Sequence, residues 1–182
     1  TVYSKSVYLE DGALEKYGAT SASRKPMLRL EFGGFQIAAV EPTADALGGT
    51  TTEMTIPNLE ASYTAALDFA TLKAVAGYNT YDVDSINVKS YVVGLGAKTT
   101  FGPAYLAGSF FLGQNLGTYG FKTATDADPV ISGSSLVDNE SFGCTLIAGY
   151  KLNDMLSFEA GYGYTESELD LAASNKDDAS QY

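Results

Sequence analysis

Apolar side chains occur at every second position over long stretches of this chain, and this spacing restricts the possible folds most. From Leu156 to Thr165, leucine, phenylalanine, alanine and tyrosine alternate with serine, glutamate, glycine and threonine. The stretch from Phe142 to Lys151 alternates in the same way, and Asn153-Asp154 between the two is typical of a turn. A period of two is characteristic of a β-strand with two different faces. The two stretches are therefore predicted to pair as a hairpin.

The same pattern recurs along the chain and predicts eight strands in four hairpins: 28–32 with 35–39, 58–64 with 71–79, 90–98 with 104–114, and 142–151 with 156–165. Tight turns are expected near 33–34, 67–69, 99–103 and 152–155, and other connections at 42–56, 82–86, 115–139 and from 167 onward. Both faces of 104–114 are mixed, so the sequence leaves its inward and outward positions open.

The chain is predicted to be a single unit over residues 1–182. Residues 1–25 are expected to form a loop, with a possible short helix from Leu9 to Tyr17. Residues 26–166 hold the four hairpins, and residues 167–182 are expected to form a second loop. The 82–86 connection is short, and it departs from the alternation of tight turns and long loops that barrels show.

The composition of the two strand faces predicts an all-β, antiparallel transmembrane β-barrel. One face carries leucine, alanine, tyrosine and phenylalanine, with aromatic rings often near strand ends, as in the girdles at a lipid boundary. The other face is small or polar and suits a wet lumen. No apolar stretch approaches the ~20 residues of a membrane-spanning helix, whereas a spanning strand needs only ~9–11 residues. The alternative is a secreted β-sandwich binding module whose apolar face packs on a second sheet.

Composition also excludes several classes of function. The formal net charge of −11 argues against nucleic acid as a partner. The chain has no histidine, which removes the most common general base and metal ligand. Cys144 lies in an apolar run and is expected to be a packing residue, and Gly94-Leu95-Gly96 is too short for a nucleotide-binding loop. We predict no catalytic residues, no cofactor and no enzyme activity.

Two sets of carboxylates have residue types found in catalytic or calcium-binding sites. Glu31 and Glu159 could act as an acid–base pair if the fold brought them together, but nothing in the sequence does so. Asp126, Asp128 and Asp138 could hold Ca²⁺ at a rim, yet their spacing matches no calcium-binding loop. Both sets are expected to be ordinary solvated charges.

The best functional candidates are the charged residues on the polar strand face. They are predicted to line a pore and to bias which ions enter it: Arg29, Glu31, Glu60, Lys73, Lys98 and Glu159. Acidic residues concentrate in the long connections, so one rim should attract cations, within the range that salt screening permits.

Two stretches resemble Gram-negative outer-membrane porins of the general-diffusion type. Residues 24–42, RKPMLRLEFGGFQIAAVEP, resemble a strand–turn–strand unit of that family, and residues 113–120, GQNLGTYG, look like a strand entering a long outer loop. The resemblance implies a homotrimer of barrels with about 16 strands each, surrounded by outer-membrane lipid. It also implies passive diffusion of small hydrophilic solutes and ions, and a loop, either 1–25 or 115–139, folded into the lumen.

One departure from that family concerns the ends of the chain. Leu171 to Gln181 is polar and unlike a closing strand, so the chain is expected to be an interior segment with strands missing on both sides. A second hypothesis for function is a barrel that acts as a scaffold around a partner such as an electron-transfer protein. Single-channel conductance would separate that hypothesis from a porin.

Overall fold

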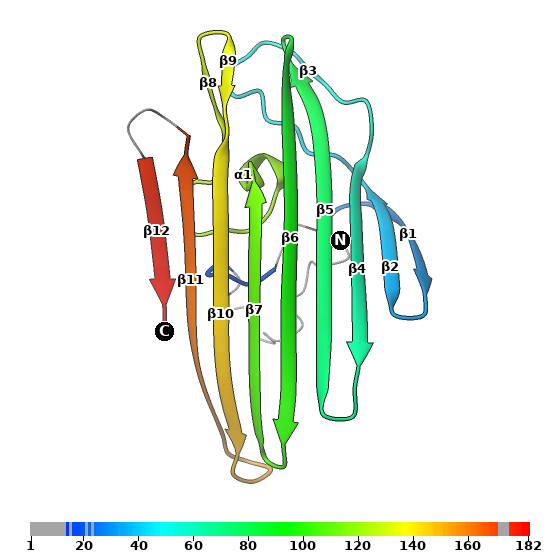
Figure 1. Ribbon diagram of the computed structural model, residues 1–182, viewed down its shortest axis with the longest axis vertical. Helices are drawn as coiled ribbons and strands as arrows, with labels where there is room; N and C mark the ends of the chain where they lie inside the picture. The colour runs from blue at the N-terminus through cyan, green and yellow to red at the C-terminus, as the bar shows by residue number, and fades with distance from the viewer. Residues whose placement is uncertain (1–13, 15, 21, 23, 171–174) are drawn as a thin grey trace.

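The computed structural model describes residues 14, 16–20, 22, 24–170 and 175–182. Its main sheet has the strand order β1-β2-β4-β5-β6-β7-β10-β11-β12, with β3 paired to β5 off this path (Figure 1). Every strand pairing among the described residues is antiparallel. The sheet is open, with β1 and β12 at its edges. The strands are β1 Met27–Phe32, β2 Phe35–Val40, β3 Thr52–Glu53, β4 Asn58–Ala66, β5 Ala70–Val83, β6 Ile86–Phe101, β7 Ala104–Gln114, β10 Asn139–Lys151, β11 Ser157–Leu169 and β12 Asn175–Gln181.

The eight predicted strands are confirmed, and the predicted connections differ in four places. The 42–56 connection contains β3, which pairs with β5. Residues 82–86 are not a loop, because β5 and β6 continue to a tight turn at Asp84-Ser85. The connection 115–139 contains a short helix, α1 (Leu116–Tyr119), and a separate hairpin of β8 (Val130–Ser132) and β9 (Ser135–Val137). The prediction of a loop over 167–182 is wrong, since β11 extends to Leu169 and 175–181 pairs with it as β12. The helix expected from Leu9 to Tyr17 falls mostly outside the described residues.

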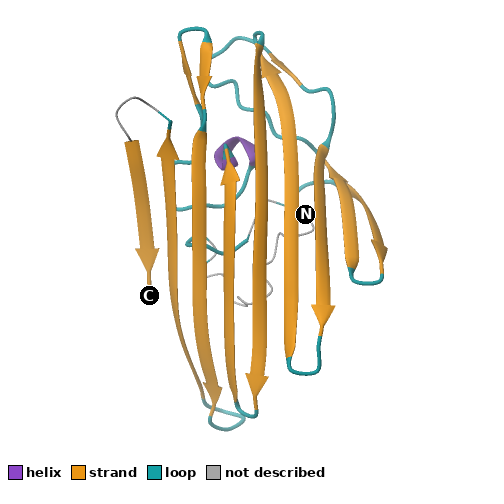
Figure 2. Ribbon diagram, in the orientation of Figure 1, coloured by secondary structure: helices purple, strands orange, loops and turns teal. Residues whose placement is uncertain are grey.

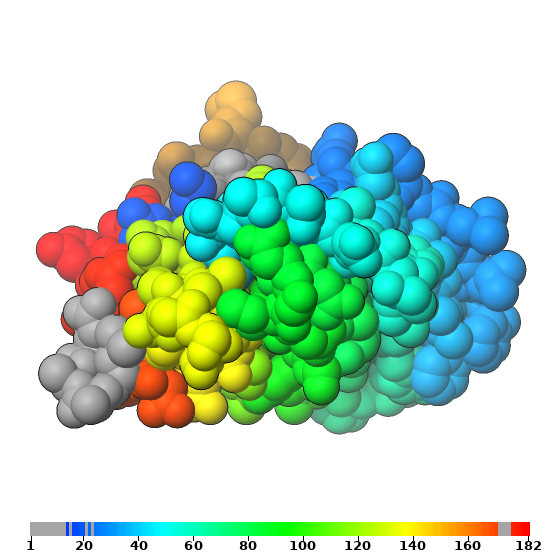
Figure 3. Space-filling view, turned by 90° about the horizontal axis from the view of Figure 1, so that it is seen from above, coloured from blue at the N-terminus to red at the C-terminus, as the bar shows by residue number. Residues whose placement is uncertain are grey.

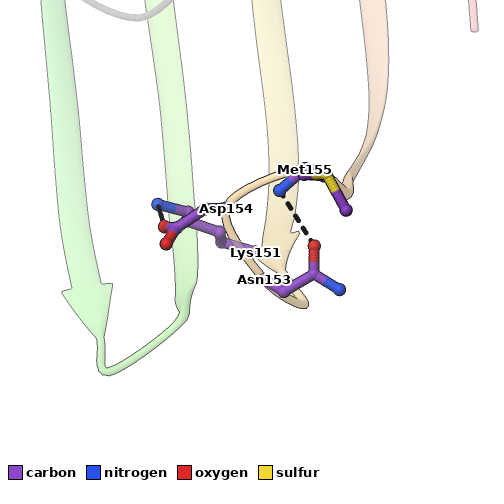
Figure 4. A network of polar contacts seen from close by, with 4 residues as sticks. All are labelled: Lys151, Asn153, Asp154 and Met155. Atoms are coloured by element: carbon purple, nitrogen blue, oxygen red, sulfur yellow. Dashed lines mark hydrogen bonds and ion pairs between the residues drawn. The ribbon is translucent and has the colours of Figure 1, made fainter.

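The predicted tight turns lie together at one end of the sheet, which we call the turn end. Gly33 and Gly102 adopt φ values of 57° there, a conformation that favours glycine. In the β10–β11 turn, the backbone N–H of Met155 donates to Asn153 Oδ1 at 2.9 Å, and Lys151 Nζ lies 2.8 Å from Asp154 Oδ1 (Figure 4). The turn predicted at Asn153-Asp154 is therefore present, and the Asn153 side chain stabilises it through a hydrogen bond to the backbone.

The apolar face of the sheet is uncovered, and we call it the outer face. Leu146, Phe158 and Tyr162 are 57%, 59% and 46% exposed. A β-sandwich would bury these side chains against a second sheet. Within the described part of the chain, the second sheet is the small β8–β9 hairpin, which does not cover this face. The apolar face is therefore not the core of a sandwich.

The apolar belt on the outer face crosses the strands obliquely. Hydrogen-bonded partners in a sheet form rows perpendicular to the strands. One such row contains, from β1 to β12, Leu30, Ile37, Ala61, Ala76, Val93, Leu112, Phe142, Glu166 and Asp178. The row is apolar as far as β10 and charged on β11 and β12, because on β11 the outward apolar residues begin closer to the turn end, at Tyr164.

An oblique belt is the pattern that tilted membrane-spanning strands produce. Strands in outer-membrane barrels tilt by ~35–45°, so a band parallel to the membrane cuts across the rows. On β6 the band runs from Tyr91 to Phe101, and on β10 from Phe142 through Tyr150, with aromatic rings at both ends. The tilt also explains why β12 carries polar side chains: its residues pair with the part of β11 that lies beyond the belt.

The opposite end of the sheet, the loop end, is held together by its own small core. Tyr81, Val83 and Val88 are buried there beneath residues of the 42–56 connection and of the β8–β9 hairpin. Figure 3 shows these parts from above, with the cyan connection beside the green β5–β6 turn and the yellow hairpin. This packing explains why β5 and β6 extend past the apolar belt.

Asp84, in the β5–β6 turn, fixes the 42–56 connection to the loop end. Its carboxylate accepts hydrogen bonds from the backbone N–H groups and the hydroxyls of Thr50 and Thr51, at 2.8–3.3 Å. These donors, led by the Thr50 N–H, lower the pKa of Asp84 from its usual 3.8 to about 2.

We expect an NMR titration of the Asp84 carboxyl carbon to have its midpoint near 2. A lowered folded pKa means that this contribution to stability is complete above the unfolded pKa of 3.8 and disappears as pH falls through about 2. Replacing both Thr50 and Thr51 with valine removes two hydroxyl donors and should move the midpoint upward. A midpoint of 3.8 in the unchanged protein would contradict the capping role.

Candidate solute pathway on the inner face

Two segments of chain lie on the inner face of the sheet, opposite the apolar belt. We call the described residues of 14–22 and of 115–128 the inner layer; α1 belongs to it (Figure 2). Ala22 forms an isolated β-bridge with Phe121, and the Ala124 N–H donates to the Lys16 carbonyl at 2.8 Å. The resemblance left open which of two loops folds inward, and the structure places the described parts of both on the inner face, joined to each other.

Glycines on the inner face make room for this layer. A Cβ on Gly143 would lie 2.7 Å from Gly18 Cα, and one on Gly163 would lie 2.3 Å from the Tyr17 carbonyl oxygen. A Cβ on Gly94 would lie 2.7 Å from the Thr20 side chain. From the sequence, this small-residue face is expected to border a wet lumen. Where the inner layer covers this face, that expectation is wrong. The space that the glycines leave is filled by residues of the inner layer and not by water.

The inner layer has its own apolar contacts with the wall. Phe111 of β7 is fully buried and packs edge-to-face on Phe121, with ring centroids 4.8 Å apart. Leu116 and Tyr119 of α1 join the same cluster. Phe111 points inward and Phe110 outward, which explains why the two faces of 104–114 looked alike in the sequence.

Asn115 anchors the start of α1 to the wall. It adopts φ 54°, and its side-chain amide donates to the Lys89 carbonyl at 2.8 Å and to Asp138 Oδ1 at 2.7 Å. Its Oδ1 accepts the Asn139 N–H at 2.8 Å. These bonds join β6, β10 and the helix at one fully buried residue, so they fix where the inner layer leaves the wall.

A second polar contact region lies where the inner layer meets β4. Glu60 is only 2% exposed and accepts a hydrogen bond from the Tyr119 hydroxyl at 3.2 Å. Lys25 donates to Thr43 Oγ1 nearby. Burial lowers the pKa of Lys25, and the carboxylates of Glu41 and Glu60 oppose that shift. Glu60 therefore shares the inner face, as predicted, but it is covered by the inner layer and is not exposed in a lumen.

The other five predicted pore-lining residues also have inner-face positions, with partly or fully exposed side chains. On the central strands, Lys73 and Lys98 are diagonal neighbours, since Lys73 pairs with Gly96 and Lys98 with Thr71. Lys98 Nζ lies 4.6 Å from the centre of the Tyr105 ring, within cation–π distance.

The remaining predicted charges lie toward the two edges of the sheet. Arg29 and Glu31 form an exposed ion pair on β1, with 2.9 Å between Nη2 and Oε1. Glu159 lies on β11, across the sheet from them. Glu31 and Glu159 are therefore not brought together as an acid–base pair within this sheet.

The acidic residues of the loop end form no recognisable metal site. The side chain of Asp138 accepts from Asn115, and Asp126 Oδ1 accepts the Asp128 N–H at 3.2 Å. Burial, together with repulsion from Asp126 and Asp45, raises the pKa of Asp128. Among the residues that the structure describes, no group of three or more acidic or thiol ligands could hold a metal ion. No described helix is long and apolar enough to cross a membrane.

Comparison with known proteins identifies the fold. No protein-family profile and no curated sequence matches the chain. The crystal structure of the outer membrane channel DcaP of Acinetobacter baumannii is similar, with a TM-score of 0.68 at 13% sequence identity. The similarity covers 98% of this chain and 66% of that channel, so the chain spans just under two thirds of its length. At this identity the similarity establishes the fold alone: the chain folds like part of the wall of an outer-membrane channel.

Proposed function

We propose that the protein is an outer-membrane channel that lets small hydrophilic solutes and ions diffuse passively through a water-filled pore. The observation that carries this proposal is the oblique apolar belt, because it fits tilted strands in a bilayer. In a closed barrel, the face opposite such a belt lies on the inside, and here that face carries charged residues and small side chains. The inner layer narrows that interior, and the solute gradient is the driving force.

The finer features of the proposal follow the porin resemblance. They are a barrel of about 16 strands, association into homotrimers, and surroundings of bacterial outer-membrane lipid. The chain needs no cofactor for this function, since diffusion through a hydrated pore involves no bond making or breaking. The exposed side chains of Arg29, Glu31 and Glu159, with the partly exposed Lys73 and Lys98, would set the local field along the wall.

We further propose that the loop end biases the channel toward cations. Asp45, Asp126 and Asp128 lie within reach of one another there, since two of them act on the pKa of the third. An acidic mouth raises the local cation concentration, and salt weakens the effect beyond a Debye length of ~8 Å at physiological ionic strength.

Planar-bilayer recordings test the proposal. The protein should form ohmic pores, and the reversal potential in a potassium chloride gradient should favour K⁺ most at low salt. Replacing Asp126 and Asp128 together with asparagine should reduce that preference. Glu140→Gln is the control, because Glu140 faces outward on β10 and should not change selectivity.

Two outcomes would count against the proposal. A protein that inserts but conducts no ions would favour the scaffold hypothesis, in which a partner fills the barrel. Pores whose selectivity is the same in the aspartate variant and the original protein would leave the channel function standing and remove the cation bias.

A further inference from the structure

The outer face carries a hollow among the residues that the structure describes. It has a volume of 710 Å³ and lies over the middle strands of the sheet. Ala74, Ala97 and Gly108 form its floor, and Tyr63, Leu95 and Phe110 stand at its rim. Ala97 of β6 and Gly108 of β7 are register partners, and Ala74 of β5 is two residues from Leu72, the β5 partner of Ala97. The hollow therefore arises where small side chains on neighbouring strands fall together.

The hollow offers only apolar contacts. Ser109 and Thr145 also border it, but alternation along their strands turns their side chains to the inner face. Their hydroxyls lie 2.6 Å from each other there, and Ser109 Oγ also donates to the Gly18 carbonyl. Lys73 borders the hollow between two outward residues, so alternation places its ammonium on the inner face as well.

The hollow lies at mid-height in the apolar belt. On β6 the belt extends from Tyr91 to Phe101, and Leu95 and Ala97 occupy its middle. Lipid headgroups and water do not reach this depth of a bilayer, whose hydrocarbon core is about 30 Å thick. An occupant must therefore be hydrocarbon, supplied either by a lipid or by another protein surface.

We propose that this hollow binds the acyl chain of a membrane lipid, which rests on the proposed membrane-embedded function. The hollow is continuous with the apolar belt, which lipid acyl chains cover in the proposed membrane location. Acyl chains are therefore available along the whole rim of the hollow. An empty hollow would leave its lining without van der Waals partners, whereas a flexible chain fills an irregular apolar space. A phospholipid acyl chain seated there is retained against competing detergent better than one on the flat parts of the belt.

Tryptophan fluorescence can test this site, because the chain contains no tryptophan. Leu95→Trp places a single reporter at the rim, and Ala160→Trp places one on the belt of β11, away from the hollow. Both variants are prepared in dodecyl maltoside micelles that contain increasing fractions of phosphatidylcholine brominated at mid-chain, so that the phospholipid competes with detergent for the outer face. We expect half-quenching of Leu95→Trp at a several-fold lower brominated fraction than of Ala160→Trp. Adding Ala97→Phe, which fills the hollow, should remove that difference.

The outcomes separate the lipid site from the proposed function. Equal quenching of both reporters, or a difference that persists after Ala97→Phe, overturns the acyl-chain site and leaves the membrane location intact. Weaker quenching of Leu95→Trp than of Ala160→Trp also overturns it, because a second protein copy would then cover the hollow. If neither reporter is quenched, the protein is not embedded in hydrocarbon, and the proposed function fails together with this inference.

Discussion

Replacing Leu146 with arginine is expected to abolish stable insertion of the protein into bilayers. Leu146 is 57% exposed on the outer face of β10, near the middle of the apolar belt. An arginine at the midplane of a barrel's lipid face costs about 2–4 kcal/mol. Flotation of liposomes after refolding, together with the heat-dependent gel mobility of folded barrels, measures the inserted fraction.

The same substitution should have little effect if this face lies in water and not in lipid. Leu146 would then be an ordinary surface residue, and surface changes usually alter stability by no more than about 0.5 kcal/mol. Gln36→Arg is the matched control, because Gln36 has an inner-face position on β2 and arginine there stays out of lipid. Insertion of Leu146→Arg as efficient as that of the control would rule out contact between this face and hydrocarbon.

Replacing Gly143 with valine should displace the 14–22 part of the inner layer and raise single-channel conductance. The new Cβ would lie 2.7 Å from Gly18 Cα and 2.6 Å from the Phe111 ring. Overpacking of this kind costs about 1–3 kcal/mol. Gly18, itself at φ 98°, has no space to retreat toward the wall, because a Cβ added to it would lie only 2.2 Å from the Cys144 carbonyl oxygen.

Conductance in planar bilayers and hydrogen exchange over residues 16–22 are the two measurements for this variant. The displaced segment should lose protection while the strands keep theirs, because the valine enters the lumen and leaves the lipid face unchanged. Ala148→Val on the outer face of the same strand is the control and should leave both readouts as they were. Unchanged conductance with a displaced segment would show that the inner layer does not narrow the pathway.

Much of the sheet could be predicted because its determinants are local. Strand faces follow from a period of two, and tight turns at Gly33-Gly34 and Asn153-Asp154 set the register of the strands that they join. Once the register is set, the partners across each hairpin follow residue by residue, as in Leu146 opposite Tyr162. The inner-face positions of Lys73, Lys98 and Glu159 are consequences of the same alternation.

The exceptions are places where a distant part of the chain decides the outcome. β12 has no apolar alternation, yet its backbone pairs with β11, and Lys176 Nζ lies 2.7 Å from Glu166 Oε1. Strands β5 and β6 continue through 82–86 because Val83 and Val88 are covered by loops from elsewhere in the sequence. Neither pairing partner nor covering loop is encoded in the local pattern.

The sequence by itself determined which face of each strand is apolar, where the tight turns lie and which charges share the polar face. Only the tertiary structure decided what covers that polar face. A glycine beside water and a glycine beside another segment of chain look identical in a sequence, since both lack a side chain. The burial of Glu60 under Tyr119, and of Gly143 under Gly18, depends on contacts between residues far apart in the chain.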